Sequence, residues 1–212
     1  MIFDAIIFDM DGVLVDSEPL AMEAMRQVMA RHGVVYTEAD NDEFLGRTTI
    51  EECRILQARH GLGPSAEELT SQYVGVLVGL IRERPRPMPG VPDVLRRLRA
   101  AGYRLALASS ADPVVIATNV GGLRLGDCFD SVVSGTEVAR GKPAPDVFLE
   151  TAGRLGLPAP RCLVVEDSRN GLVAAKAAGM ACAAIPCEST RHQDFSEADY
   201  RLRTLTDLLG FL

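Results

Sequence analysis

Two aspartates that close an apolar run are spaced for chemistry. Asp9 and Asp11 follow residues 6–8, a run typical of a buried strand, and Gly12 then permits a sharp turn. Side chains two residues apart on a strand point the same way, so both carboxylates are predicted to face one spot. Paired like charges need a cation such as Mg²⁺ or a shared proton, and one carboxylate could then be a nucleophile and the other an acid and base. The alternative is a strand end with two solvated aspartates.

Polar residues also follow two later runs that are predicted as strands. Ser109 and Ser110 come after residues 103–108, where a hydroxyl and free backbone N–H groups before a helix suit phosphate oxygens. An N-cap serine is the alternative there. Glu166 and Asp167 follow another apolar run and would supply the distal carboxylates of a metal site. The alternative for this acidic pair is a negative charge at a helix N-terminus.

Lysine is rare in this chain, which makes one of its positions informative. Of the 22 basic residues only Lys142 and Lys176 are lysines. Lys142 lies in Gly-Lys-Pro-Ala-Pro, a proline-stiffened loop that favours a fixed point charge over a solubilising one. Lys176 lies on a predicted helix face and is expected to be solvated.

Alternating strand and helix patterns predict an α/β fold. Residues 1–16 and 87–212 are expected to form a Rossmann-like core, a parallel sheet with helices on both faces and a final helix near 205–212. Ligands bind beyond the carboxyl ends of the strands in such sheets, where the polar motifs would meet. Residues 17–86 read as a helical cap inserted after the first strand, and residues 84–92, with four prolines and a glycine, read as a linker.

The predicted cap carries local signals for helix starts. Ser17 is a candidate N-cap of its first helix, with Pro19 near the start. Ser65 and Glu68 are spaced as a capping box for its last helix.

Composition limits the class of protein. A chain of 212 residues with 47% hydrophobic and 24% charged residues is globular, and a net charge of −7 argues against binding to nucleic acid or anionic membranes. No apolar run reaches membrane-spanning length, and the N-terminus lacks the features of a signal peptide. We therefore predict a cytoplasmic protein with reduced thiols, each a small core residue: Cys53, Cys128, Cys162, Cys182 and Cys187.

Taken together, four motifs resemble those of the haloacid dehalogenase superfamily, in that family's order and over nearly the whole chain. They are Asp9-Met-Asp11-Gly-Val-Leu, the strand ending at Ser109, Lys142 in Gly-Lys-Pro-Ala-Pro-Asp, and Glu166-Asp167-Ser168-Arg-Asn-Gly171. The helical insert is similar to the family's C1 cap. The segment Asp16-Ser17-Glu18-Pro19-Leu20 resembles the β-phosphoglucomutase-like phosphatase subgroup.

The resemblance implies a phosphatase mechanism for a small phosphorylated metabolite such as a sugar phosphate. Asp9 would attack phosphorus and form an aspartyl-phosphate, while Asp11 would protonate the leaving oxygen and then activate water. Ser109 and Lys142 would bind the phosphoryl oxygens. The implied Mg²⁺ ligands are Asp9, the backbone carbonyl of Asp11, and Asp167, with Glu166 as a further ligand or support.

Other members of the superfamily are alternatives. The dehalogenases lack the second aspartate, so Asp11 favours phosphoryl transfer, and a phosphonatase needs a cap lysine that residues 17–84 do not contain. A β-phosphoglucomutase-type mutase is the main alternative, although Ala21 stands where the mutase has a histidine. A non-catalytic binding protein of the same fold is a minor alternative.

Two cap residues complete the predicted site. Arg47, near the mutase's cap arginine but shifted in register, is a candidate for contacting substrate, with a solvated arginine as the alternative. Glu18, at the start of the cap, is a second candidate, with a hinge role as the alternative. Ser110 would assist Ser109 in binding substrate, and the enzyme is expected to act as a monomer.

Overall fold

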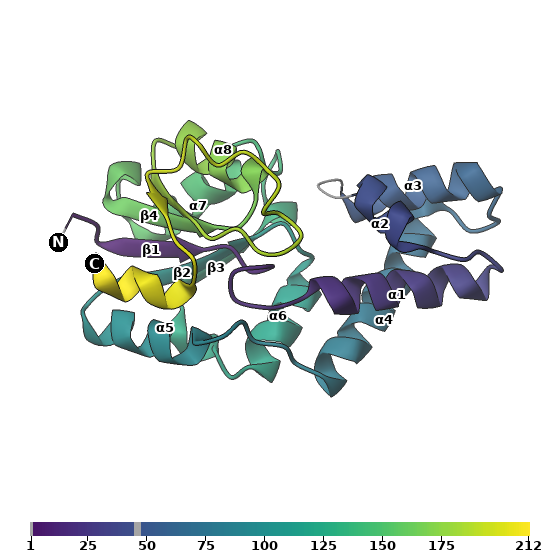
Figure 1. Ribbon diagram of the computed structural model, residues 1–212, viewed down its shortest axis with the longest axis horizontal. Helices are drawn as coiled ribbons and strands as arrows, with labels where there is room; N and C mark the ends of the chain where they lie inside the picture. Colours follow the sequence, from purple (N-terminus) through teal and green to yellow (C-terminus); the bar gives the residue numbers. More distant parts are fainter. Residues whose placement is uncertain (1, 45–47) are drawn as a thin grey trace. The chain divides into compact units, whose positions relative to one another are not determined.

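The computed structural model describes residues 2–44 and 48–212, with Asp42 described by its backbone only, and the chain divides into two compact units (Figure 1). One unit, called the core here, comprises Met1–Asp16 and Arg86–Leu212. The other, called the cap, comprises Ser17–Pro85. The cap is therefore one continuous segment placed between two parts of the core.

The core is built on a parallel sheet with the strand order β3-β2-β1-β4-β5-β6. The central strand β1 pairs on one side with β2 and on the other with β4, so that Ala5 lies opposite both Arg104 and Cys162. All five pairings are parallel, which confirms the predicted α/β fold. The strands are β1 (Ala5–Phe8), β2 (Arg104–Ser109), β3 (Ser131–Ser134), β4 (Cys162–Glu166), β5 (Ala181–Ala184) and β6 (Tyr200–Arg201).

Helices cover both faces of this sheet, which explains why its strands are continuous apolar runs. Ile7 and Val164 pack on one face with Phe148 and Leu172, which belong to α7 and α8. Figure 1 shows α7 and α8 on this face and α5 on the opposite one. Because side chains alternate along a strand, Ile6 and Phe8 of β1 point to the face opposite that of Ile7. The core helices are α5 (Val91–Ala100), α6 (Pro113–Gly122), α7 (Asp146–Leu155) and α8 (Arg169–Ala177).

The end of the chain differs from the prediction of a final α-helix. Leu205–Gly210 forms a 3₁₀-helix instead, started by a capping box between Thr204 and Asp207. Leu205 and Leu208, three residues apart, are the buried positions of this element. A spacing of three matches one 3₁₀ turn, so this spacing suits the tighter helix.

Within its described residues, the cap consists of four helices around a hydrophobic core of its own, which includes Met29, Leu56 and Leu69. The predicted capping box is confirmed. The Ser65 hydroxyl accepts a hydrogen bond from the backbone N–H of Glu68, and the backbone N–H of Ser65 donates to the Glu68 carboxylate. Ser17 occupies the N-cap position of α1 without a side-chain capping hydrogen bond, so only its position was predicted correctly. The cap helices are α1 (Glu18–Arg31), α2 (Glu38–Phe44), α3 (Thr49–His60) and α4 (Ala66–Glu83).

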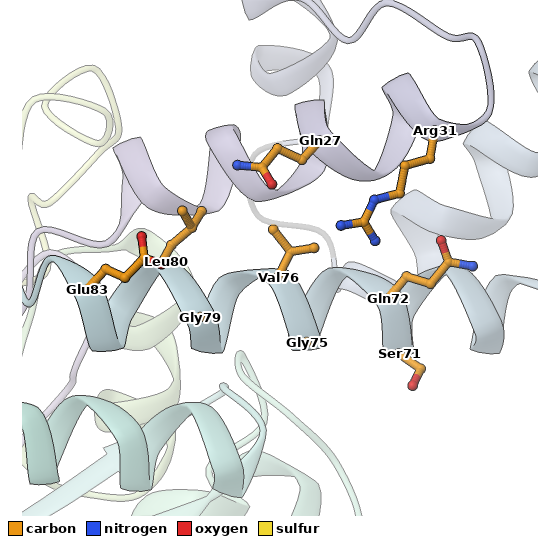
Figure 2. Close-up of a pocket in the computed structure, with 9 residues that line it drawn as sticks. All are labelled: Gln27, Arg31, Ser71, Gln72, Gly75, Val76, Gly79, Leu80 and Glu83. Atoms are coloured by element: carbon orange, nitrogen blue, oxygen red, sulfur yellow. The ribbon is translucent and has the colours of Figure 1, made fainter.

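A hollow of about 540 Å³ lies along α1 and α4 within the cap (Figure 2). Gly75 and Gly79 leave α4 without side chains there, while Gln27 and Arg31 of α1 border the space. Of the described residues that line it, Glu83 is the one carboxylate, so the hollow offers no acidic cluster. Within the described ranges, no helix is both long enough and apolar enough to cross a lipid bilayer.

Candidate active site

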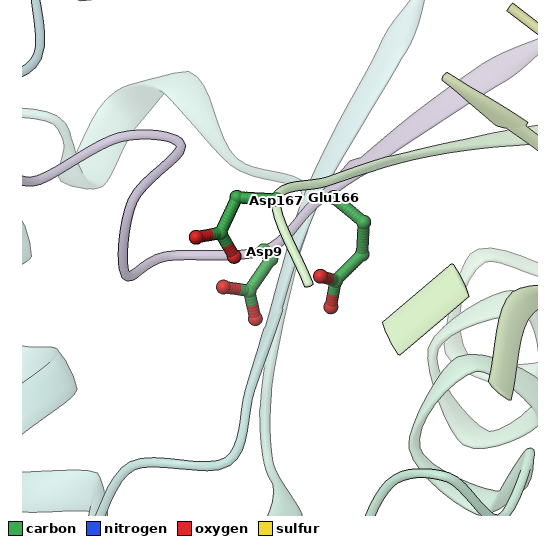
Figure 3. Close-up of side chains that lie close together, drawn as sticks. All are labelled: Asp9, Glu166 and Asp167. Atoms are coloured by element: carbon green, nitrogen blue, oxygen red, sulfur yellow. The ribbon is translucent and has the colours of Figure 1, made fainter. Parts of the chain in front are cut away.

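Three acidic residues meet where two neighbouring strands end. Asp9 directly follows β1, Glu166 is the last residue of β4, and Asp167 follows it. Because β1 and β4 are adjacent and parallel, their carboxyl ends lie together. Each residue offers a carboxylate oxygen, and these oxygens lie within 4.8 Å of one another (Figure 3). All three side chains are buried.

Lys142 is fixed among these carboxylates. Its Nζ donates to Asp9 Oδ1 at 2.5 Å, to Glu166 Oε1 at 2.7 Å and to the carbonyl of Ala108 at 3.2 Å. The lysine side chain is only 7% exposed. Burial opposes its charged form, but the carboxylates of Asp9 and Glu166 outweigh this and raise the Lys142 pKa above its usual value. The three hydrogen bonds hold the ammonium in a set position.

The Glu166 carboxylate is bound on both oxygens. Oε1 accepts from Lys142, while Oε2 accepts from the backbone N–H of Ser168 at 3.0 Å and from its hydroxyl at 2.9 Å. The carboxylate also lies against Gly171 in the first turn of α8, where an added Cβ would come within 1.8 Å of Oε1. A side chain at Gly171 would therefore displace Glu166.

Asp167 is enclosed in a similar way. A Cβ at Gly12, whose φ of 73° already favours glycine, would lie 2.2 Å from Asp167 Oδ2. The thiol of Cys187 donates to the same oxygen at 3.1 Å. Sequence reasoning missed Cys187 because no local motif marks it. Only the adjacency of β4 and β5 brings it to Asp167.

With all of its acids ionised, the cluster would carry more negative than positive charge. Among its described residues, three carboxylates face the ammonium of Lys142. Burial, together with the charges of Glu166 and Asp11, raises the pKa of Asp9 to about 7 in spite of Lys142. Burial and the neighbouring Glu166 and Asp9 raise the pKa of Asp167 to about 10. A hard divalent cation with oxygen ligands would offset this surplus charge, and the donor set fits such a cation.

Other predicted core residues lie near this edge of the sheet. Asp11 is half-buried in the turn after β1, where it bridges to Val15. Ser109 is wholly buried at the end of β2, and its Oγ accepts from the backbone N–H of Ala111 at 3.1 Å. A serine hydroxyl that accepts one hydrogen bond can still donate its own proton. Ser110 follows as an exposed residue.

The two predicted cap residues, Glu18 and Arg47, belong to the other unit. Glu18 is the first residue of α1 and accepts a hydrogen bond at 2.7 Å from Asn41, within the cap. Arg47 lies outside the described residues.

Acidic groups and a fixed lysine lie at the strand ends of a parallel sheet with helices on both faces, which is where enzymes with an α/β fold bind their ligands. Residues 3–179 match the haloacid dehalogenase-like hydrolases, and the chain belongs to this family, as its motifs predicted.

Named relatives refine this assignment. Protein CbbY of Rhodobacter capsulatus is 37% identical over 221 residues, covering 95% of this chain and 93% of that protein. Hexitol phosphatase B of Escherichia coli (strain K12) is 33% identical over 207 residues, covering 96% and 93%. A mutant of CbbY from Rhodobacter sphaeroides, solved with xylulose-1,5-bisphosphate, superposes with a TM-score of 0.87 at 29% identity, covering 97% of this chain and 96% of the other. The enzyme is accordingly a phosphoric monoester hydrolase.

Proposed function

We propose that this phosphatase is Mg²⁺-dependent and hydrolyses a sugar or sugar-alcohol phosphate through an aspartyl-phosphate on Asp9. The observation that carries the proposal is the buried group of Asp9, Glu166 and Asp167, which holds Lys142 and still has a surplus of negative charge. The carboxylates suit a cation, and this cation and Lys142 together would supply the positive neighbours that phosphoryl oxygens need.

The residues that would hold Mg²⁺ follow from which oxygens are already engaged. Both oxygens of Glu166 accept hydrogen bonds, from Lys142 and Ser168, so its role is chiefly to support the site. Asp9 and Asp167 would bind the ion directly, with the backbone carbonyl of Asp11. When bound, the ion supplies positive charge that stabilises the phosphoryl oxygens.

The first half of the reaction transfers the phosphoryl group to the enzyme. A carboxylate oxygen of Asp9 attacks phosphorus, and the bond between phosphorus and the ester oxygen breaks. Asp11 donates a proton to that leaving oxygen, which departs as the sugar hydroxyl. The ammonium of Lys142 and the hydroxyl of Ser109 stabilise the charge on the transferring group.

The second half releases phosphate. Asp11, now deprotonated, takes a proton from a water molecule while the water oxygen attacks the phosphorus of the acyl phosphate. The bond between phosphorus and the Asp9 oxygen breaks, which frees inorganic phosphate and restores both carboxyl groups to their starting protonation states.

The substrate class rests on the relatives. Hexitol phosphatase B is named for a sugar-alcohol phosphate, and CbbY binds a ketose bisphosphate in its solved structure. A mutase would need a histidine early in α1, where this chain has Ala21. His32 lies just beyond the other end of α1 and its ring nitrogen is 3.1 Å from Gln72 Oε1, so it does not replace that group.

The test is phosphate release from a panel of hexitol phosphates, xylulose 1,5-bisphosphate, β-glucose 1-phosphate and nucleotides, with Mg²⁺ and with EDTA. We expect release from sugar or sugar-alcohol phosphates, loss of release in EDTA, and a fall of about a thousandfold or more in Asp9→Asn with the circular dichroism spectrum retained. Formation of glucose 6-phosphate without net release would instead establish the mutase. Activity that survives Asp9→Asn would refute the nucleophile.

A further inference from the structure

The loop that follows β5 returns to the acidic cluster. Because β5 pairs with β4, its carboxyl end lies beside Glu166 and Asp167. The backbone N–H of Ile185 donates to the carbonyl of Glu166 at 2.7 Å, which anchors the start of the loop. Further along the loop, Cys187 and Thr190 contact Asp167.

Two side chains of this loop contact one oxygen of Asp167. Cys187 Sγ donates to Oδ2 at 3.1 Å, and Thr190 Oγ1 lies 3.5 Å from the same atom. These donors are themselves held in place, since the backbone N–H of Cys187 donates to Thr190 Oγ1 at 3.1 Å. The hydroxyl of Ser189 lies 3.1 Å from the Cys187 sulfur. Thr190 is only 8% exposed, so its hydroxyl is not a solvated surface group.

Gly12 approaches the same oxygen from another direction. The absence of a Cβ there lets the turn after β1 come against Asp167 Oδ2, as the 2.2 Å approach of an added Cβ indicates. Oδ2 is therefore enclosed by a backbone turn and by two donors from the loop. Fixing one oxygen of a carboxylate also fixes the direction of the other.

We propose that Cys187 and Thr190 are positioning residues that orient the Asp167 carboxylate so that its second oxygen is presented to Mg²⁺. The proposal rests on the proposed Mg²⁺-dependent function. Mutation of a group that hydrogen-bonds a metal ligand typically lowers metal affinity or activity about 10- to 100-fold. A thiol is a weak donor, so the effect of Cys187 belongs at the lower end of that range.

The test measures Mg²⁺ binding by isothermal titration calorimetry without substrate, together with the Mg²⁺ dependence of turnover. In Cys187→Ala we expect the dissociation constant for Mg²⁺ to rise about tenfold, and the deficit in turnover to shrink as Mg²⁺ is raised. Thr190→Val, which removes the hydroxyl at nearly constant volume, should shift the constant in the same direction. Cys187→Ser retains a donor and should recover much of the affinity.

Cys128→Ala is the matched control, because Cys128 is the other half-buried cysteine and lies in the 3₁₀-helix Gly126–Cys128. It should bind Mg²⁺ like the wild type. Wild-type affinity in folded Cys187→Ala and Thr190→Val would overturn the positioning role alone. A wild-type enzyme that binds no Mg²⁺ and remains active in EDTA would instead overturn the proposed function, and with it this inference.

Discussion

The core and the cap each contain carboxylates with polar partners, but the partners of these carboxylates differ between the two units. In the cap, Glu52 accepts a hydrogen bond at 2.6 Å from the hydroxyl of Tyr36, and Glu18 accepts one from Asn41. Each of these acids has a neutral donor supplied by the cap itself. In the core, Asp9, Glu166 and Asp167 converge within 4.8 Å around a single described ammonium.

The difference separates carboxylates that complete a fold from carboxylates that we propose to hold a metal ion. Burial raises the pKa of Glu52, and the nearby Glu18 adds to this, while the hydrogen bond from Tyr36 opposes it. That arrangement is consistent with a structural pair. The core cluster concentrates negative charge beyond what its own donors offset, an arrangement that is costly unless a cation completes it.

Replacing the core ammonium should have the largest effect. In Lys142→Met we expect turnover to fall several-hundred-fold, about 3–4 kcal/mol of lost transition-state stabilisation, because Asp9 and the phosphoryl group lose their fixed positive neighbour. The measurement is kcat for phosphate release at saturating substrate and Mg²⁺.

The only other lysine provides the matched control. Lys176 on α8 donates to both oxygens of Asp199 at 2.8 Å, in a pair about one-third exposed, and Lys176→Met should keep turnover within about twofold. Equal losses of turnover in Lys142→Met and Lys176→Met would contradict a specific role for the position of Lys142 in the site.

Moving Glu166 without changing its chemistry should have an intermediate effect. The Cβ of Gly171→Ala would overlap the Glu166 carboxylate and shift it away from Lys142, so we expect turnover to fall roughly 10- to 100-fold. Gly153→Ala on α7 is the control, because nothing lies within 4 Å of its added Cβ. It should leave turnover unchanged and add about 0.5–1 kcal/mol of stability. Full activity in Gly171→Ala would show that Glu166 does not position the lysine.

The smallest effect on turnover is expected in the cap. Tyr36→Phe removes the donor to Glu52 and should lower the free energy of unfolding by about 1 kcal/mol, measured by urea denaturation, with turnover within about twofold. If turnover instead fell more than tenfold at unchanged stability, the cap pair would belong to the substrate site and the contrast with the core would fail.

Much of this arrangement could be predicted because it follows from strand order and from strand ends. The apolar runs before Asp9, Ser109 and Glu166 became β1, β2 and β4, and parallel pairing alone brings their ends to one edge. The capping box of Ser65 and Glu68 was equally predictable, since it depends on residues three apart. The roles of the site residues remain predictions for the variants described above.

Features that depend on long-range contacts could not be predicted. The strand Tyr200–Arg201 is too short to show a pattern. The expectation that every cysteine is a core residue was wrong for Cys128 and Cys187, which are half-buried. Neither the contact of Cys187 with Asp167 nor the close approach of Gly171 to Glu166 has a local signal, because each depends on how separate segments pack.

The order of the strands has a consequence for synthesis of the chain. β1 emerges first, but its two neighbours begin at Arg104 and Cys162, so the central strand waits for the rest of its sheet. At about 5–20 residues per second this wait lasts roughly 10–30 s. The cap, whose hydrophobic core draws only on its own continuous segment, is complete well before then. A nascent chain therefore carries an unpaired apolar strand after the whole cap segment has been made, and that strand is where binding by chaperones would be most useful.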